Sequence, residues 1–111
     1  MLDGLASRLE HYMDLVSARQ TLVASNVANA DTPGYKTKDL DFQMEFLSQI
    51  EGAAPHAIEV AGLKTRNDGN NVSLDREARL LAENALRFNV ASSLLRSEIT
   101  AMKSAIQEGK P

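Results

Sequence analysis

Cysteine and tryptophan are missing from this chain of 111 residues, and aromatic residues make up only 5% of it. Without cysteine the chain has no disulfide, no thiolate metal ligand and no cysteine nucleophile. With so few large rings, aliphatic and small residues must do most of the packing. The length fits one domain, so we expect a single core at most.

An excess of positive charge is also missing. The formal net charge is -3, and the basic residues alternate with acidic ones along the sequence. A protein that binds nucleic acid needs a basic patch to meet the phosphates, so we expect no nucleic-acid partner. No stretch approaches the roughly 18 apolar residues that span a bilayer, and the first residues lack a basic region followed by an apolar run. We therefore expect no cleavable signal peptide, so any export must use another machinery.

Motifs of catalysis and ligand binding are absent as well. The sequence contains no G-x-S-x-G elbow and no glycine-rich phosphate loop, and its six glycines are dispersed. His11 and His56 lack helically spaced metal-binding neighbours, so we expect surface roles for both. Asp39 and Asp41 are interpreted as solvated carboxylates, and residues 68–71 as a tight turn instead of a calcium loop. We expect no enzyme activity, no cofactor, no metal and no small-molecule substrate.

What the sequence does contain is helical periodicity, first in its N-terminal part. Apolar residues recur there at alternating steps of four and three, a heptad pattern that predicts a helix from Leu2 to Ala28. Arg19 occupies one slot of this pattern, while Leu15 and Leu22 flank it and predict burial on more than one side. The predicted packing residues of this helix are Leu5, Leu9, Tyr12, Val16, Val23 and Val27.

The C-terminal part shows the same pattern without a miss. No glycine or proline interrupts residues 74–108, so we expect one helix of about 50 Å. Ser73 is the expected N-cap, without a reciprocal capping box because Arg76 stands three residues later. Gly109 and Pro111 should end the helix. The predicted packing seam runs through Leu74, Ala78, Leu81, Ala85, Phe88, Ser92, Leu95, Ile99, Met102 and Ile106.

Between the helices the periodicity breaks, and glycine and proline punctuate residues 31–73. We expect a short helix within Asp41 to Glu51 and a short extended segment from Ala57 to Val60. Thr32, Pro33, Gly34 and Tyr35 predict a type II turn, because proline sets the first central φ and glycine accepts the positive φ that follows.

The predicted fold is therefore mainly α, with two long terminal helices in an antiparallel coiled-coil-like pair around an irregular middle that contains a turn and little β. Residues 1–30 and 74–111 form the helical part, and residues 31–73 form the middle. The pattern alone leaves two interpretations open. The chain is either an isolated helical hairpin or small bundle, or a subunit whose wide apolar surface other chains cover.

Residues 24–36 read ASNVANADTPGYK, an asparagine-alanine repeat that leads into Thr-Pro-Gly-Tyr. This segment resembles the N-terminal motif of flagellar axial proteins, the rod and hook family. The motif residues are Asn26, Asn29, Thr32, Pro33, Gly34 and Tyr35. The later run at residues 68–77, DGNNVSLDRE, resembles the element before the C-terminal helix in small rod proteins of that family. Which of those small rod proteins the chain matches stays open between close paralogues.

The resemblance implies a structural subunit of the bacterial flagellar basal body, exported by the flagellar type III apparatus and assembled at the base of the rod in the periplasm. The two predicted seams would pack against each other and against neighbouring subunits. The implied partners are copies of this chain, other rod proteins, the rod adaptor protein and the export gate. Tyr35 and Lys36 are candidates for subunit contact. The alternative from another class is a small cytoplasmic helical adaptor or type III secretion chaperone.

Overall fold

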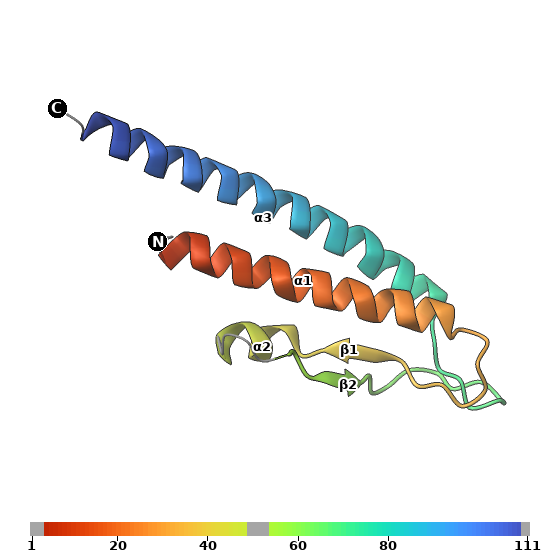
Figure 1. The fold of residues 1–111 in the computed structure, drawn as a ribbon. Helices are drawn as coiled ribbons and strands as arrows, with labels where there is room; N and C mark the ends of the chain where they lie inside the picture. Colours follow the sequence, from red (N-terminus) through yellow and green to blue (C-terminus); the bar gives the residue numbers. More distant parts are fainter. Residues whose placement is uncertain (1–3, 49–53, 110–111) are drawn as a thin grey trace.

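The computed structural model describes residues 4–48 and 54–109 of the chain. Their order is helix α1 (Gly4–Ala28), strand β1 (Lys38–Leu40), helix α2 (Phe42–Ser48), strand β2 (Ala57–Glu59) and helix α3 (Leu74–Glu108). Helices α1 and α3 lie side by side and run in opposite directions (Figure 1). This arrangement confirms the expected mainly helical fold with two long terminal helices.

Helix α3 is the longest element and begins at the predicted residue. The hydroxyl of Ser73 accepts a hydrogen bond from the backbone N–H of Arg76 at 3.2 Å, which confirms the expected cap. The helix has 35 residues against 25 in α1. The C-terminal turns of α3 therefore extend past Gly4, the first described residue of α1 (Figure 1). The molecule measures 72 × 25 × 18 Å. Leu2 and Pro111, which we expected near the helix ends, lie outside the described residues.

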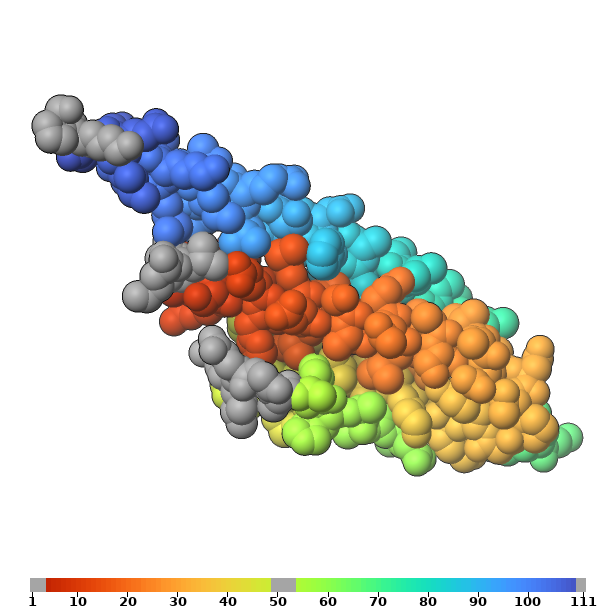
Figure 2. Space-filling view, viewed as in Figure 1, coloured from red at the N-terminus to blue at the C-terminus, as the bar shows by residue number. Residues whose placement is uncertain are grey.

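Helix α1 has neighbours on two sides. It packs along α3 on one side and against β1 and α2 on the other, and Figure 2 shows it between these two layers. Leu15, Val16 and Val23 are buried as a result. In the second half of α1, the wide apolar face that the sequence predicted is therefore buried within the subunit.

The middle of the chain contains a two-stranded antiparallel pair. Lys38 of β1 stands opposite Glu59 of β2, and Leu40 stands opposite Ala57. Leu40 is buried toward α1, whereas all three residues of β2 are exposed. The expected extended segment from Ala57 is confirmed for residues 57–59.

Aromatic rings fasten α2 to α1. The Tyr12 ring meets the rings of Phe42 and Phe46 edge-on, with centroids 5.4 and 6.0 Å apart, and the His11 ring stacks on Phe46 at 5.7 Å. His11 therefore contributes to packing, and the expected plain surface role is wrong for it. The expected helix is confirmed over Phe42–Ser48, whereas its predicted end at Glu51 lies outside the described residues.

Polar side chains share the described core with apolar ones. The buried apolar residues include Leu15, Val16 and Leu80, but Asn26, Asn70 and Glu77 are buried just as completely. A buried polar group is costly unless it is hydrogen-bonded. At the end of the molecule where α1 ends and α3 begins, Asn26 bonds Glu77, and Asn70 bonds backbone carbonyls.

Candidate assembly interface

Two loops that are distant in sequence join at that end of the molecule. The side-chain amide of Asn70 donates to the carbonyls of Asn29 and Thr32 at 2.9 and 2.8 Å, and the backbone N–H of Gly34 donates to the carbonyl of Asp68 at 2.9 Å. We call residues 26–40 and 66–77 the motif hub. It unites both segments that resemble the flagellar family, so the two sequence motifs form one structural unit.

The hub contains the predicted turn. The backbone N–H of Tyr35 donates to the carbonyl of Thr32 at 3.2 Å, and Gly34 has a φ of +77°. This is the conformation that a type II turn requires of its glycine, so the expectation is confirmed. Asn29 bonds the local backbone as α1 ends, through its amide and the carbonyl of Ser25 at 2.8 Å. Thr32, Pro33 and Gly34 are exposed.

Asn26 is fully buried and uses both ends of its amide. The nitrogen donates to the carbonyl of Lys38 at 2.8 Å and to Oε1 of Glu77 at 2.7 Å. The oxygen accepts from the hydroxyl of Tyr35 at 2.9 Å and from the backbone N–H of Lys38 at 3.1 Å. One side chain therefore ties the end of α1 to the turn, to β1 and to the first turn of α3.

A chain of charges continues from Glu77. Arg76 links the carboxylates of Glu77 and Asp39 at 2.8 and 2.5 Å, and Arg19 of α1 binds Asp39 through two parallel hydrogen bonds of 2.9 Å. Paired arginines are the usual way to keep buried carboxylates ionised. The interpretation of Asp39 as a solvated carboxylate is wrong, since its exposed fraction is 5%. Asp41 is exposed, as expected.

The ionisation of Asp39 reflects these contacts. Burial alone would raise the pKa of its carboxyl group, but the hydrogen bonds from Arg19, from the Leu40 backbone and from Arg76 outweigh it and hold this pKa below its ordinary value. For Arg76, burial acts to lower the pKa, yet the hydrogen bonds to Glu77 and Asp39 raise it. Asp39 and Arg76 are therefore both charged under neutral conditions.

Tyr35 and Lys36 already have polar partners inside the subunit. The Tyr35 hydroxyl lies between Asn26 and Ser25, and the Lys36 ammonium donates to the carbonyl of Gly69 at 2.6 Å. Thr37 is held in a similar way by the side chain of Asn71, which accepts from its N–H and its hydroxyl at 2.7 and 2.8 Å. These residues shape the hub, while their contact with other subunits stays a prediction.

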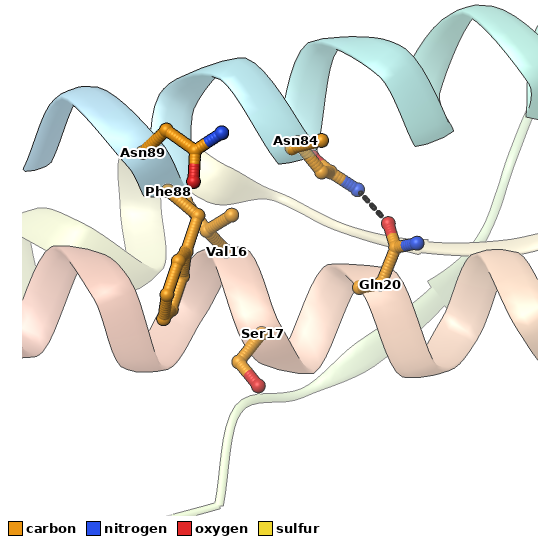
Figure 3. A pocket seen from close by; sticks show the side chains of 7 residues that line it. Val16, Ser17, Gln20, Asn84, Phe88 and Asn89 are labelled. Carbon is orange, nitrogen blue, oxygen red and sulfur yellow. Dashed lines mark hydrogen bonds between the residues drawn. The ribbon is translucent and has the colours of Figure 1, made fainter. Parts of the chain in front are cut away.

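The contact between the long helices uses a stripe one residue earlier on α3 than the predicted seam. Glu77, Leu80, Asn84 and Ala91 are the buried residues of α3. The most deeply buried residues in the first half of α3 therefore lie beside the predicted seam. Phe88 of the seam lines a cavity with Val16 of α1 (Figure 3), and the packing of the seam on other chains stays a prediction. The exposed large residues of the predicted seam are Leu74, Leu81, Phe88 and Ile106, and the exposed fractions of Leu81 and Phe88 are 50% and 40%. The pattern of apolar residues did not reveal this register, because two of the buried positions are occupied by the polar residues Glu77 and Asn84.

The other predicted packing residues divide between the inside and the edge of the subunit. Val16 and Val23 are buried, and Leu95, Ile99 and Met102 are half-buried on the last turns of α3. Leu5 and Val27 are exposed. Leu5, Leu9 and Tyr12 also line an apolar groove of about 530 Å³ together with Phe46, Leu86, Val90 and Leu94. The outward apolar surface of the helices therefore lies on both flanks of their contact.

Several residues in or next to the motif hub were not identified as site residues from the sequence. Arg19, Asp39, Arg76 and Glu77 form the ion-pair chain, and Asn70 joins the two loops. One signal was present, since Arg19 interrupts an otherwise apolar heptad pattern. A charged residue in such a slot needs a buried partner, but its identity depends on the tertiary fold.

Metal-binding clusters and membrane-spanning helices were two further possibilities for the described residues. These residues contain no group of three or more histidine and acidic side chains that could hold a metal ion. None of the described helices is both long and apolar enough to cross a membrane. His56 is exposed, as expected, and its ring nitrogen Nδ1 lies 3.1 Å from the carboxylate of Glu45.

Comparison with known proteins shows to which family this chain belongs. A family model described as flagella basal body rod protein matches residues 13–36, which span the second half of α1 and the turn. The flagellar basal body rod protein FlgB of Escherichia coli is 30% identical over 138 aligned positions, covering 98% of this chain and 99% of that protein. This chain belongs to the FlgB family.

Other FlgB proteins are similar along their full length. That of Salmonella typhimurium is 29% identical, with 98% of this chain and 99% of the relative covered, and that of Bacillus subtilis is 24% identical, with 99% and 98% covered. The alignments are longer than this chain, so the relatives contain residues without a counterpart here. Membership in the FlgB family confirms the resemblance that the sequence motifs indicated. It also shows that the chain is a structural, non-enzymatic protein of the flagellar rod.

Proposed function

We propose that this chain is a subunit of the proximal flagellar rod and packs through its terminal helices against copies of itself and other rod proteins. The observation that carries the proposal is the outward stripe of α3, which we define as Leu74, Leu81 and Phe88. All three residues are exposed although they follow a strict heptad spacing. A stripe of this kind is typical of a helix that packs against another helix.

The free energy of assembly would come from burying these side chains. Fully burying one leucine or phenylalanine contributes about 1.5–3 kcal/mol. The outward stripe offers several such side chains, one in every seven residues of the helix. The groove that contains Leu5 and Leu9 adds a second apolar flank. Two flanks allow each subunit to meet more than one neighbour, as a tube of helices requires. Residues 1–30 and 74–111 would then form the inner coiled-coil part of the rod.

The motif hub supports this function by holding the helices at a defined angle. Its hydrogen bonds and ion pairs connect α1, β1 and α3, so the two helices cannot separate at this end without breaking buried polar contacts. A rod transmits force, and a hub of this kind would keep the subunit stiff. The middle segment, residues 31–73, would make lateral contacts between subunits.

We also propose the route and the neighbours that the family resemblance implies. The subunit would leave the cytoplasm through the flagellar type III apparatus without a cleavable signal peptide. It would assemble in the periplasm next to the rod adaptor protein and the export gate. The support for these details is the resemblance of the motif segments.

The test is Leu81→Asp, compared with Ala82→Asp as a matched control. Both introduce the same carboxylate at neighbouring exposed positions of α3, but only Leu81 lies in the outward stripe. We expect Leu81→Asp to be exported at a normal level and to abolish rod assembly, because burying an unpaired carboxylate costs several kcal/mol. Ala82→Asp should assemble.

Two measurements decide the outcome. The secreted amount of each variant reports export, and isolated basal bodies together with swimming report assembly. Normal basal bodies with Leu81→Asp would contradict the role of the outward stripe. Equal loss of assembly in both variants would contradict the helical register that we assign to it.

A further inference from the structure

The sequence contains two Asp-Gly steps, at residues 3–4 and 68–69, and the second lies in the motif hub. An aspartate that precedes glycine isomerises readily, because glycine has no side chain to hinder attack by its own backbone nitrogen. The Gly69 nitrogen would lose its proton, bond to Cγ of Asp68 and displace a carboxyl oxygen as water, which gives a cyclic succinimide. Water then opens the ring at either carbonyl. One product is isoaspartate, in which the backbone continues through the side-chain carboxyl carbon.

The backbone polar groups of the Asp68–Gly69 step all have partners in the hub. The carbonyl of Asp68 accepts a hydrogen bond from the N–H of Gly34 at 2.9 Å, and the N–H of Gly69 donates to the carbonyl of Arg66 at 2.9 Å. The carbonyl of Gly69 accepts from the Lys36 ammonium at 2.6 Å. Gly34 and Lys36 belong to the other motif segment, so the docking of the two loops fixes the orientation of this peptide unit.

These contacts oppose the two movements that the reaction requires. The nitrogen of Gly69 must leave its carbonyl partner and face the carboxyl carbon, and the carboxylate of Asp68 must leave the backbone N–H of Asn70, from which it accepts at 3.0 Å. Both movements rotate the peptide unit and break its bonds to the other loop. Space is short as well, since a Cβ atom added at Gly69 would lie 3.3 Å from the Cα of Gly34.

We infer that the motif hub protects Asp68 from isomerisation, and that Asp68 is the site at which a subunit with an open hub is chemically altered. A reaction that proceeds only from an opened state is slowed in proportion to the small population of that state. The side chain is 41% exposed, so solvent reaches it once the loops separate. The inference does not depend on the proposed role of the chain in the rod.

The alteration would also prevent the hub from closing again. Isoaspartate lengthens the backbone of the loop by one carbon atom, which is about 1.5 Å of additional chain. The carbonyls of Asp68 and Gly69 would then no longer lie opposite their donors Gly34 and Lys36 together. Isomerisation in the open state would therefore remove a subunit from the population that folds.

Ageing of the purified chain in warm neutral buffer tests the protection. Isoaspartate at Asp3 and Asp68 is measured by peptide mapping after labelling with isoaspartyl methyltransferase. In concentrated urea we expect isoaspartate at both residues, which shows that the assay detects both steps. Without urea, isoaspartate at Asp68 should form at least about tenfold more slowly. Equal rates at Asp68 with and without urea would overturn the inference.

Variants that open the hub should remove the protection without changing the Asp-Gly step. Asn70→Ala deletes the amide that bonds two carbonyls of the other loop, so isoaspartate at Asp68 should form about tenfold faster. Lys36→Met is milder, because it removes only the bond to the Gly69 carbonyl, and it should raise the rate less. Asn67→Ala, at an exposed position beside the step, is the control and should leave the rate unchanged.

Leu15→Ala distinguishes the hub from the stability of the whole fold. Leu15 lies in α1 outside the hub and is 2% exposed, so its truncation weakens the core. The variants are aged at a temperature at which circular dichroism shows them folded. The rate at Asp68 should rise for Asn70→Ala and stay near that of the unsubstituted chain for Leu15→Ala. A similar rise for both would overturn the inference, because the protection would then come from global stability.

Discussion

The amide of Asn26 donates a hydrogen bond of 2.7 Å to the carboxylate of Glu77, which lies 51 residues away along the chain. Both side chains are completely buried. The contact joins the last turns of α1 to the first turn of α3 and places the two family motifs in one hub. A pair of this kind is costly to break, because the partner left behind stays buried.

Asn26→Asp should therefore destabilise the subunit. The new carboxylate keeps the shape of asparagine but loses both donated hydrogen bonds and faces the acidic Glu77. We expect a loss of about 3 kcal/mol in the free energy of unfolding, measured by urea denaturation. Asn67→Asp, the same change at an exposed loop position, should cost little. Similar losses for both variants would contradict the buried network.

The carboxyl group of Asp39 makes the free energy of unfolding depend on pH. Its folded pKa lies below the ordinary value, so its contribution is present at pH values above the pKa of the unfolded chain and is lost as the pH falls through the folded pKa. Asp39→Asn should cost about 2 kcal/mol at pH 7, less than for a fully buried pair because Arg19 and Arg76 stay partly in water.

The difference in unfolding free energy between Asp39→Asn and the unsubstituted chain should shrink below about pH 4. Denaturation curves from pH 7 to pH 3 measure this, with Asp14→Asn at an exposed position of α1 as the control. A difference that stays constant over this range would show that folding does not lower the pKa of Asp39.

Gly69→Ala should be worse than Gly62→Ala. Both glycines have a positive φ, +86° and +81°, so any side chain is strained at either position by roughly 1–2 kcal/mol. Only at Gly69 would the added methyl group meet backbone, the Cα of Gly34 at 3.3 Å, whereas Gly62 faces open space. The larger drop in melting temperature should therefore belong to Gly69→Ala. Equal drops would mean that the two loops do not touch at this point.

Phe46→Ala should loosen α2 from α1. The ring contacts both Tyr12 and His11, and its removal should cost about 2 kcal/mol, below the 3–5 kcal/mol of a fully buried phenylalanine because the ring is half-buried. Leu47→Ala, at an exposed neighbouring position, should cost far less. Thermal unfolding of the two variants makes the comparison, and a larger loss for Leu47→Ala would contradict the observed packing.

Much of the local structure could be predicted from the sequence. The unbroken heptads predicted α3 to its first residue, and proline followed by glycine predicted the turn at residues 32–35. These features depend on backbone preferences and on the spacing of neighbours, which a short stretch of sequence contains. The motif residues also indicate the flagellar family from the sequence alone.

The register between α1 and α3 could not be predicted in the same way. An apolar count selected Leu81 and Phe88, whereas Glu77 and Asn84 occupy the buried stripe. A buried glutamate or asparagine is stable only with partners, and the partners Asn26, Arg76 and Gln20 are recognisable only once the chain is folded.

The sequence by itself determined that this protein has two long helices, a tight turn after the first and no cysteine chemistry. Only the tertiary structure decided that Asp39 is buried between two arginines and that the two motifs dock on each other. The physical reason is range. Helix and turn preferences act over a few residues, whereas the bonds from Arg19 to Asp39 and from Asn26 to Glu77 join residues that are 20 and 51 positions apart.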